Sequence, residues 1–221
     1  MKIIGLLGSP RGKKSNTLKL LESALQGAAD AGAGVEIIDI THKNINYCIG
    51  CEKCYETGKC FREDDHHEVF DKVLEADGLI MASPVYFNSV SAQLKTFMDR
   101  TPYHRHCLSL IGKYGMAVVT TASSGAPGTA DLISGYLVDL GAFSIGSTCV
   151  ALPVLPANLE AGRNRAYAMG KDLVDAIATG RQYPEQKTTQ DVFIRNFKFV
   201  VKYNKEKWKA KYEHYEAKKW L

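Results

Sequence analysis

The chain has 221 residues, of which 45% are hydrophobic and 24% are charged, a composition typical of a soluble globular protein. Its length favours one domain with enough chain to bury a core, and it is too short for an eight-unit β/α barrel. The apolar run before Gly8 is shorter than a secretion signal, and no stretch approaches a membrane span. We therefore expect a cytoplasmic protein that does not enter a membrane.

The net charge of +4 is unevenly distributed along the chain. Residues 198–221 contain eight lysines and three glutamates, which give this segment a charge of +5 and leave −1 for the remainder. A basic tail can attract nucleic acid or an anionic membrane, but a solvated helix face is the favoured interpretation. We accordingly expect neither nucleic acid nor a membrane as a partner.

Short apolar runs alternate with stretches of helical periodicity as far as residue 179. The runs predict strands at 2–7, 35–40, 78–83, 114–121 and 144–152. The periodic stretches predict helices at 17–31, 67–76, 91–100, 129–140 and 157–179. Because strands that alternate with helices pair in parallel, the pattern predicts an α/β fold: a flavodoxin-like doubly wound sheet of five parallel strands in the order 2-1-3-4-5.

A polar linker is predicted over residues 180–189, which divides the chain into a domain at 1–180 and a basic helical extension at 181–221. Apolar side chains recur along the extension at helical spacing, namely Phe197, Val201, Trp208, Tyr212 and Tyr215. Such a stripe on a lysine-rich helix predicts packing against the domain or a partner subunit, with binding to a membrane surface as the alternative.

Four cysteines, Cys48, Cys51, Cys54 and Cys60, lie within thirteen residues in the pattern C-x2-C-x2-C-x5-C. Four cysteine thiolates are the usual ligands of an iron–sulfur cluster. Structural zinc normally takes two separated pairs of ligands, and c-type haem requires C-x-x-C-H, so neither pattern is matched. The spacing favours a [4Fe-4S] cluster. Free or redox-active thiols and a zinc site remain the alternatives.

The loop after the first predicted strand is rich in polar donors, which are Ser9, Arg11, Ser15, Asn16 and Thr17. In this architecture ligands bind beyond the carboxyl ends of the strands, where a helix N-terminus attracts phosphate. The loop matches neither the G-x4-G-K-[ST] nor the G-x-G-x-x-G pattern, which disfavours a nucleoside triphosphatase and a Rossmann site. It predicts a phosphate site, and a simple helix cap by Ser15 or Asn16 is the alternative.

Two further loops follow strands at the same predicted edge. After the third strand, Pro84 stiffens a turn in which Tyr86 and Phe87 offer the flat apolar surface that an isoalloxazine ring requires. After the fourth strand, residues 120–126 are small and polar enough for the backbone to approach a ligand. Three such loops at one edge predict a shared ligand pocket.

These segments resemble the flavodoxin-like NADPH-dependent FMN reductase superfamily and, within it, the iron–sulfur flavoproteins. Residues 8–12 with 15–17, the four-cysteine segment, and residues 83–100 carry the resemblance, which covers roughly residues 1–180. It implies an FMN phosphate site at Ser9, Arg11, Ser15, Asn16 and Thr17, and an isoalloxazine site at Pro84, Val85, Tyr86, Phe87 and Asn88. It implies that Thr121, Ser123 and Gly125 complete the pocket, and that Cys48, Cys51, Cys54 and Cys60 bind [4Fe-4S].

The resemblance implies electron transfer through FMN and a cluster, with the chemistry supplied by the cofactors and no catalytic side chain. It implies NAD(P)H or ferredoxin as the redox partner, a small-molecule acceptor as a further option, and a homodimer or homotetramer. One alternative is an NAD(P)H-dependent FMN or quinone reductase without a cluster. Another is a non-enzymatic sensor that binds flavin or metal.

The remaining titratable side chains are assigned structural roles. Cys149 is expected to be a buried thiol, and Cys107, with His104 and His106, is expected to lie in a polar loop. Asp99 and Arg100 are expected to pair with each other, and residues 66–67 to open a helix.

Overall fold

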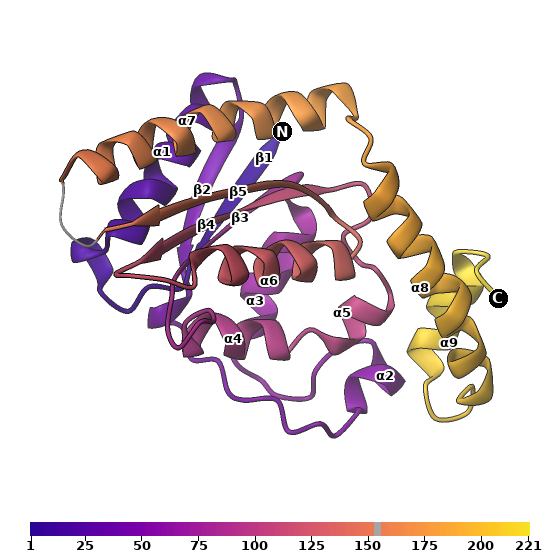
Figure 1. The fold of residues 1–221 in the computed structure, drawn as a ribbon. Helices are drawn as coiled ribbons and strands as arrows, with labels where there is room; N and C mark the ends of the chain where they lie inside the picture. Colours follow the sequence, from indigo (N-terminus) through magenta and orange to yellow (C-terminus); the bar gives the residue numbers. More distant parts are fainter. Residues whose placement is uncertain (153–155) are drawn as a thin grey trace.

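The computed structural model describes residues 1–152 and 156–221 (Figure 1). All five strands pair in parallel in one sheet with the order β2-β1-β3-β4-β5. The predicted flavodoxin-like fold is therefore confirmed. The strands are β1 (Lys2–Leu7), β2 (Gly34–Asp39), β3 (Gly78–Pro84), β4 (Tyr114–Thr121) and β5 (Phe143–Ala151).

Helices cover both faces of the sheet (Figure 1). One face carries α1 (Asn16–Asp30) and α7 (Pro156–Thr179), and the other carries α3 (His66–Glu75), α4 (Ala92–Asp99) and α6 (Ala126–Asp139). The sheet therefore separates two apolar cores, as a doubly wound fold requires.

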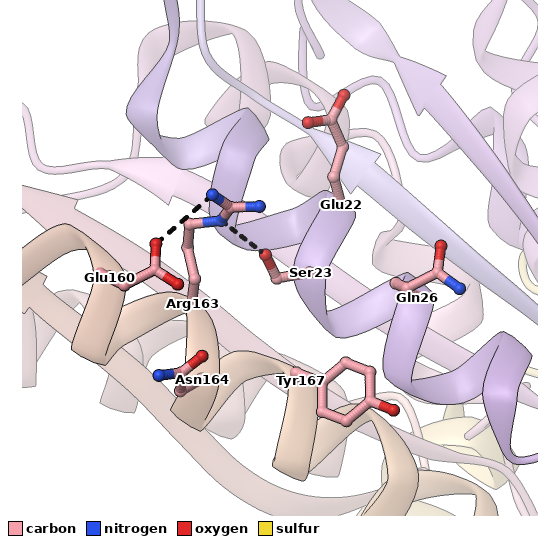
Figure 2. A pocket seen from close by; sticks show the side chains of 7 residues that line it. All are labelled: Glu22, Ser23, Gln26, Glu160, Arg163, Asn164 and Tyr167. Atoms are coloured by element: carbon pink, nitrogen blue, oxygen red, sulfur yellow. Dashed lines mark hydrogen bonds and ion pairs between the residues drawn. The ribbon is translucent and has the colours of Figure 1, made fainter.

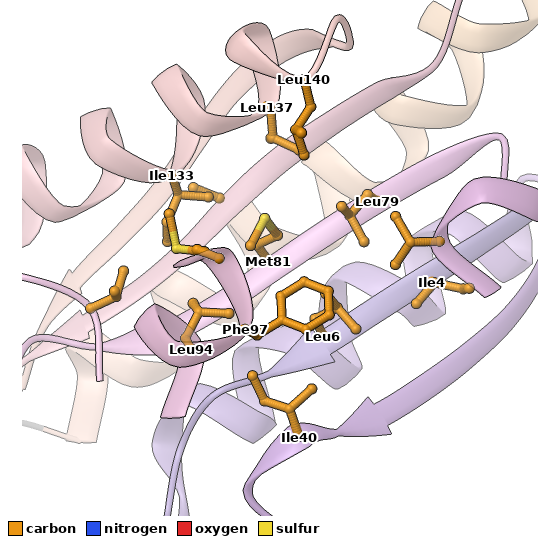
Figure 3. Close-up of a cluster of buried hydrophobic side chains, with 14 of the residues drawn as sticks. Ile4, Leu6, Ile40, Leu79, Met81, Leu94, Phe97, Ile133, Leu137 and Leu140 are labelled. Carbon is orange, nitrogen blue, oxygen red and sulfur yellow. The ribbon is translucent and has the colours of Figure 1, made fainter. Parts of the chain in front are cut away.

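Successive side chains of a strand point to opposite faces, so β1 contributes to both cores. Ile4 and Leu6 pack with Met81, Phe97 and Ile133 in the core beneath α4 and α6 (Figure 3). Ile3 and Leu7 pack with residues of α1 and α7 on the opposite face. This alternation explains why the strand reads as a continuous apolar run in the sequence.

The α1–α7 pair crosses at very short range because glycines stand at the crossing point. A Cβ atom built on Gly170 would lie 1.8 Å from the Ala24 carbonyl oxygen, and one on Gly27 would lie 2.0 Å from that of Tyr167. Beside the crossing lies a polar groove of about 300 Å³, in which Arg163 contacts Glu160 and Ser23 (Figure 2). This groove lies between two helices rather than at the ends of the strands.

Several short or late elements differ from the prediction. The cysteine segment contains the short helix α2 (Lys53–Thr57), and α5 (Pro102–His106) follows α4. The predicted linker over 180–189 is too long, because α8 (Pro184–Tyr203) begins at Pro184, a residue suited to the first turn of a helix. Within the described residues, 3₁₀ segments also span Gly12–Lys14 and Ile40–His42.

The extension is a helical pair rather than one helix. The chain leaves α8 after Tyr203, turns over residues 204–208, and continues as α9 (Lys209–Ala217). Val201, Trp208 and Tyr215 are buried, which confirms that the apolar stripe packs on the rest of the molecule. None of the helices within residues 1–152 and 156–221 combines the length and apolar character needed to cross a bilayer.

Candidate cofactor sites

A cavity of about 250 Å³ lies at the carboxyl ends of the strands. It is bounded by the loops that follow β1, β3 and β4, and by Leu152 after β5, so the three predicted loops do meet at one edge. Most of the predicted flavin residues line it, namely Ser9, Arg11, Ser15, Asn16, Thr17, Pro84, Val85, Tyr86 and Thr121.

Buried hydroxyl groups form the inner wall of this cavity. Ser15 Oγ donates to Ser9 Oγ over 2.8 Å, and the Thr17 and Thr120 hydroxyls lie 2.6 Å apart. Ser15 also caps α1, accepting a hydrogen bond from the Leu18 N–H. The helix cap is therefore present, and it leaves the first N–H groups of α1 free to face an anion.

The charge around the cavity suits a phosphate group. Arg11 contributes a guanidinium at the rim, and no acidic side chain is found among the described residues that line the cavity. The first turn of α1 likewise contains no acidic residue. An anion would therefore meet a helix N-terminus, a guanidinium and several hydroxyls.

Four of the predicted flavin residues lie beside the cavity rather than in its lining. Phe87 and Asn88 form a tight turn with left-handed φ angles of 49° and 58°, closed by hydrogen bonds between Tyr86 and Ser89. Phe87 is fully exposed. Gly125 packs against Asn88, because a Cβ on Gly125 would lie 2.5 Å from Asn88 Oδ1.

The remaining residue of this group, Ser123, donates its N–H to Thr121 Oγ1. The lining also includes Thr120 and Ala122, which belong to the loop predicted to approach a ligand, and Leu152, which was not predicted. Leu152 directly follows β5, and this position becomes informative only once the pairing of β5 with β4 is known.

The four cysteines of the motif line a second cavity, of about 270 Å³. The loop curls around it through left-handed backbone at Gly50, Glu52 and Gly58, with φ angles of 64°, 59° and 82°. Cys48 and Cys51 are exposed, and Cys54 and Cys60 are half-buried. The two cavities have no lining residue in common.

The donor set of the second cavity suits an iron–sulfur group. Over residues 1–152 and 156–221, no three Cys, His, Asp or Glu side chains converge closely enough to hold a single metal ion. In a four-iron cluster each iron takes a different thiolate. Four thiols around one cavity are compatible with that donor set.

Two arginines add positive charge to this cavity. Arg62 and Arg100 are among its lining residues, and the Nε–H of each is buried without a hydrogen-bond partner in the described part of the chain. N–H groups near cluster sulfurs stabilise thiolate charge. Burial opposes the charge of Arg100, but the hydrogen bond to Asp64 and the neighbouring Cys60 sulfur raise the pKa of its guanidinium.

Arg100 also fastens the cysteine loop to the end of α4. Its guanidinium donates to both carboxylate oxygens of Asp64, over 2.7 and 3.2 Å, and to the Asn46 carbonyl oxygen over 2.8 Å. The predicted pairing of Asp99 with Arg100 is thus wrong. Asp99, which also lines this cavity, pairs with Lys95, one helical turn earlier.

Burial and the neighbouring Cys60 raise the pKa of the Cys54 thiol to about 11, while the positive charge of Lys211 opposes the rise. Cys54 is therefore a protonated thiol at neutral pH. Metal ligation would have to displace this proton, because thiolates are the binding form.

The predicted polar loop around Cys107 is wrong. Cys107 is fully buried, and the His104 ring stacks on Phe70 at a centroid distance of 4.1 Å. Burial lowers the pKa of both His104 and His106 to about 3, so these partly buried imidazoles are neutral at pH 7. Cys149 is only partly buried, and its thiol donates to the Ala126 carbonyl oxygen.

Comparison with known proteins agrees with these features. The family model for NADPH-dependent FMN reductase matches residues 1–154. An iron–sulfur flavoprotein of Archaeoglobus fulgidus is 34% identical over 224 residues, which cover 96% of this chain and 99% of that protein. An iron–sulfur flavoprotein of Methanocaldococcus jannaschii is 48% identical over 123 residues, 56% of this chain and 63% of that protein.

Among solved structures, the NAD(P)H:quinone oxidoreductase from Methanothermobacter marburgensis shares the fold, with a TM-score of 0.63 at 19% identity. The match covers 78% of this chain and 98% of that one. Because the Archaeoglobus protein matches almost end to end, its similarity extends beyond the FMN reductase region into the C-terminal helices. The chain belongs to the NADPH-dependent FMN reductase family and, within it, to the iron–sulfur flavoproteins.

Proposed function

We propose that this flavoprotein oxidoreductase transfers electrons between FMN, bound at the carboxyl edge of the sheet, and a [4Fe-4S] cluster bound by Cys48, Cys51, Cys54 and Cys60. The observation that carries the proposal is that all four cysteines line one cavity, with the buried guanidinium of Arg100 beside Cys60. The two relatives from Archaeoglobus and Methanocaldococcus are iron–sulfur flavoproteins by name, which supports it.

When bound, FMN exchanges electrons singly or as hydride, and a cluster exchanges one at a time. The protein's part is binding and orientation. Ser9, Ser15 and Thr17 would hold the FMN phosphate with the N-terminus of α1, and Arg11 would add charge. Tyr86 and Val85 would bound the ring, with Phe87 and Asn88 at the rim and Ser123 and Gly125 behind Thr121.

We further propose NAD(P)H or ferredoxin as the redox partner and a homodimer or homotetramer as the assembly. Residues 1–180 would form the FMN domain and 181–221 its helical extension. All six cysteines are free, which is consistent with a reducing compartment such as the cytoplasm.

The proposal is tested by the cofactor content of protein purified without oxygen. We expect FMN together with iron and acid-labile sulfide in a cluster stoichiometry, and an EPR signal after reduction. A variant with all four motif cysteines changed to serine should keep its FMN and lose its iron. The Cys107→Ser variant is the matched control, because Cys107 is buried outside the motif, and it should keep both. Wild-type protein with FMN but no iron would refute the cluster.

A reductase without a cluster is the second candidate, and the exposure of Cys48 and Cys51 favours it. In that case the four-serine variant would reduce quinones with NAD(P)H as fast as the wild type. A loss of cluster-dependent electron transfer in the same variant, with FMN retained, would exclude this candidate.

A further inference from the structure

Lys211, on α9, is the buried charge that the cofactor sites leave unexplained. Of the lysines in the described residues it alone is buried, with no exposed surface. Taking an ammonium group out of water is costly unless other groups compensate its charge. The groups around Lys211 therefore indicate what the C-terminal helices contribute.

An aromatic cage surrounds the ammonium group. Lys211 Nζ lies 3.0 Å from the ring centroid of Tyr55, 3.6 Å from that of Trp208 and 5.4 Å from that of Phe197. It also donates to Nδ1 of His106 over 2.6 Å. Cation–π contacts stabilise a desolvated cation, but the cage supplies no full negative charge.

Burial lowers the pKa of the Lys211 ammonium group to about 7, and the nearby Cys107, Cys54 and Glu52 side chains only partly offset that fall. His106 is neutral, and the ion pairs of the described chain include none to Lys211. The carboxylate on the adjoining loop, Glu52, pairs instead with Lys207 at 2.6 Å. Tyr55, the ring closest to Nζ, directly follows Cys54 in the sequence. Ligation turns the neighbouring thiols into thiolates, which would bring negative charge to this side of the cage.

Helix α9 and the turn before it also contact the cysteine loop directly. Lys207 pairs with Glu52 before α2, Lys211 and Trp208 pack on Tyr55 within it, and Ala210 contacts the position of Gly58 at its end. Figure 1 shows α9 beside α2, although about 150 residues separate them in the sequence. Tyr215 anchors α9 itself by donating to the His106 carbonyl oxygen.

We propose that α9 and the turn before it, residues 204–208, clamp the cysteine loop, and that Lys211 is the positioning residue that also compensates the negative charge of the loaded loop. The charge role of Lys211 rests on the proposed function, because it requires a bound cluster. The contacts that hold the loop do not require one. The C-terminal extension, residues 181–221, would thus act on a loop of its own chain.

The test compares Lys211→Met with Lys209→Met in the full-length protein. Methionine keeps most of the unbranched apolar side chain and removes the charge, and Lys209 is an exposed lysine on the same helix. Redox titration of the reconstituted proteins, followed by EPR, should give a more negative midpoint potential for Lys211→Met, because adding an electron becomes harder without the buried cation. Lys209→Met should match the wild type. Equal potentials for all three proteins would overturn the charge role.

Hydrogen exchange in the cofactor-free proteins tests the clamp separately. The amides of Tyr55 and Gly58 donate within α2, to Glu52 and Cys54 respectively. They should exchange faster in Lys211→Met, and also in Tyr55→Leu, which removes a cage wall but keeps the lysine. Unchanged exchange in both variants would overturn the clamp. Wild-type protein that takes up no iron would refute the proposed function and leave this second test intact.

Discussion

Arg100 and Asp64 show how single residues can fix the geometry of a loop. Both side chains lack exposed surface, and Asp64 also accepts hydrogen bonds from Asn46 and the His66 N–H. Burial alone would raise the pKa of Asp64, but the hydrogen bonds from Arg100 and Asn46 hold it well below its ordinary value. The carboxylate stays charged, and the two ends of the cysteine loop stay joined to α4.

Removing one partner of a buried ion pair leaves the other charge uncompensated. We expect Arg100→Met to lower the free energy of unfolding by about 3–5 kcal/mol, as measured by urea denaturation of the cofactor-free protein. Adding Asp64→Asn should recover part of the loss, since it removes the stranded charge. Lys95→Met is the control because it breaks the exposed Lys95–Asp99 pair, which should be worth at most about 1 kcal/mol. Equal losses for Arg100→Met and Lys95→Met would contradict this explanation.

At the scale of the elements, the α1–α7 crossing depends on the missing side chain at Gly170. A methyl group there would collide with backbone rather than with a movable side chain. We expect Gly170→Ala to destabilise the protein by about 1–3 kcal/mol, the usual cost of overpacking.

Gly135, within α6, is the matched control for this substitution. A Cβ at this position meets no atom within 4 Å. Gly135→Ala should therefore stabilise the protein by about 0.5–1 kcal/mol through helix propensity. Urea denaturation of both variants checks the pair, and a gain in stability for Gly170→Ala would show that the helices can separate at little cost.

The helical segments that were not predicted from the sequence are stabilised by tertiary contacts rather than by local sequence patterns. α2 and α5 have five residues each, too few to show helical periodicity. The Gln186 side chain, which bonds both to the Ser144 N–H and to its carbonyl oxygen, ties the start of α8 to β5. Residues 180–189 were predicted to be a linker because their sequence is polar. The hydrogen-bond partner that orders Gln186 is Ser144, 42 positions away, so the local sequence does not reveal it.

At the scale of the whole molecule, buried neutral histidines couple stability to pH. Burial lowers the pKa of His66 to about 4, and His104 and His106 behave similarly. In the unfolded chain histidine titrates near its ordinary value of about 6.5. Below that pH the unfolded state therefore binds protons that the folded state does not, and stability falls as the pH drops from about 6.5 towards 4.

Replacing His66 should weaken this dependence. We expect the free energy of unfolding of His66→Asn to fall less steeply than that of the wild type between pH 6.5 and 4, by up to about 1.4 kcal/mol per pH unit. Urea denaturation over that range gives both slopes. If the free energy of unfolding fell equally steeply with pH in both proteins, His66 would take up its proton in the folded state as readily as in the unfolded state. That result would contradict the effect of burial on its pKa.

Periodicity and residue spacing in the sequence predicted the fold class and the segments that line the two cavities. Strand and helix periodicity, with turns at the strand ends, predicted the order 2-1-3-4-5, and the predicted loops meet at one edge because parallel strands end together. The spacing of Cys48, Cys51, Cys54 and Cys60 likewise indicated one site, since neighbours in sequence cannot separate far.

The residues that support these sites from distant parts of the chain become visible only in the folded protein. Arg100 pairs with Asp64 across 36 positions rather than with its neighbour Asp99, and Lys211 reaches Tyr55 and His106 from the end of the chain. No local pattern marks such partners. A buried charge takes whichever compensating group the folded chain brings near it, and periodicity carries no information about which group that is.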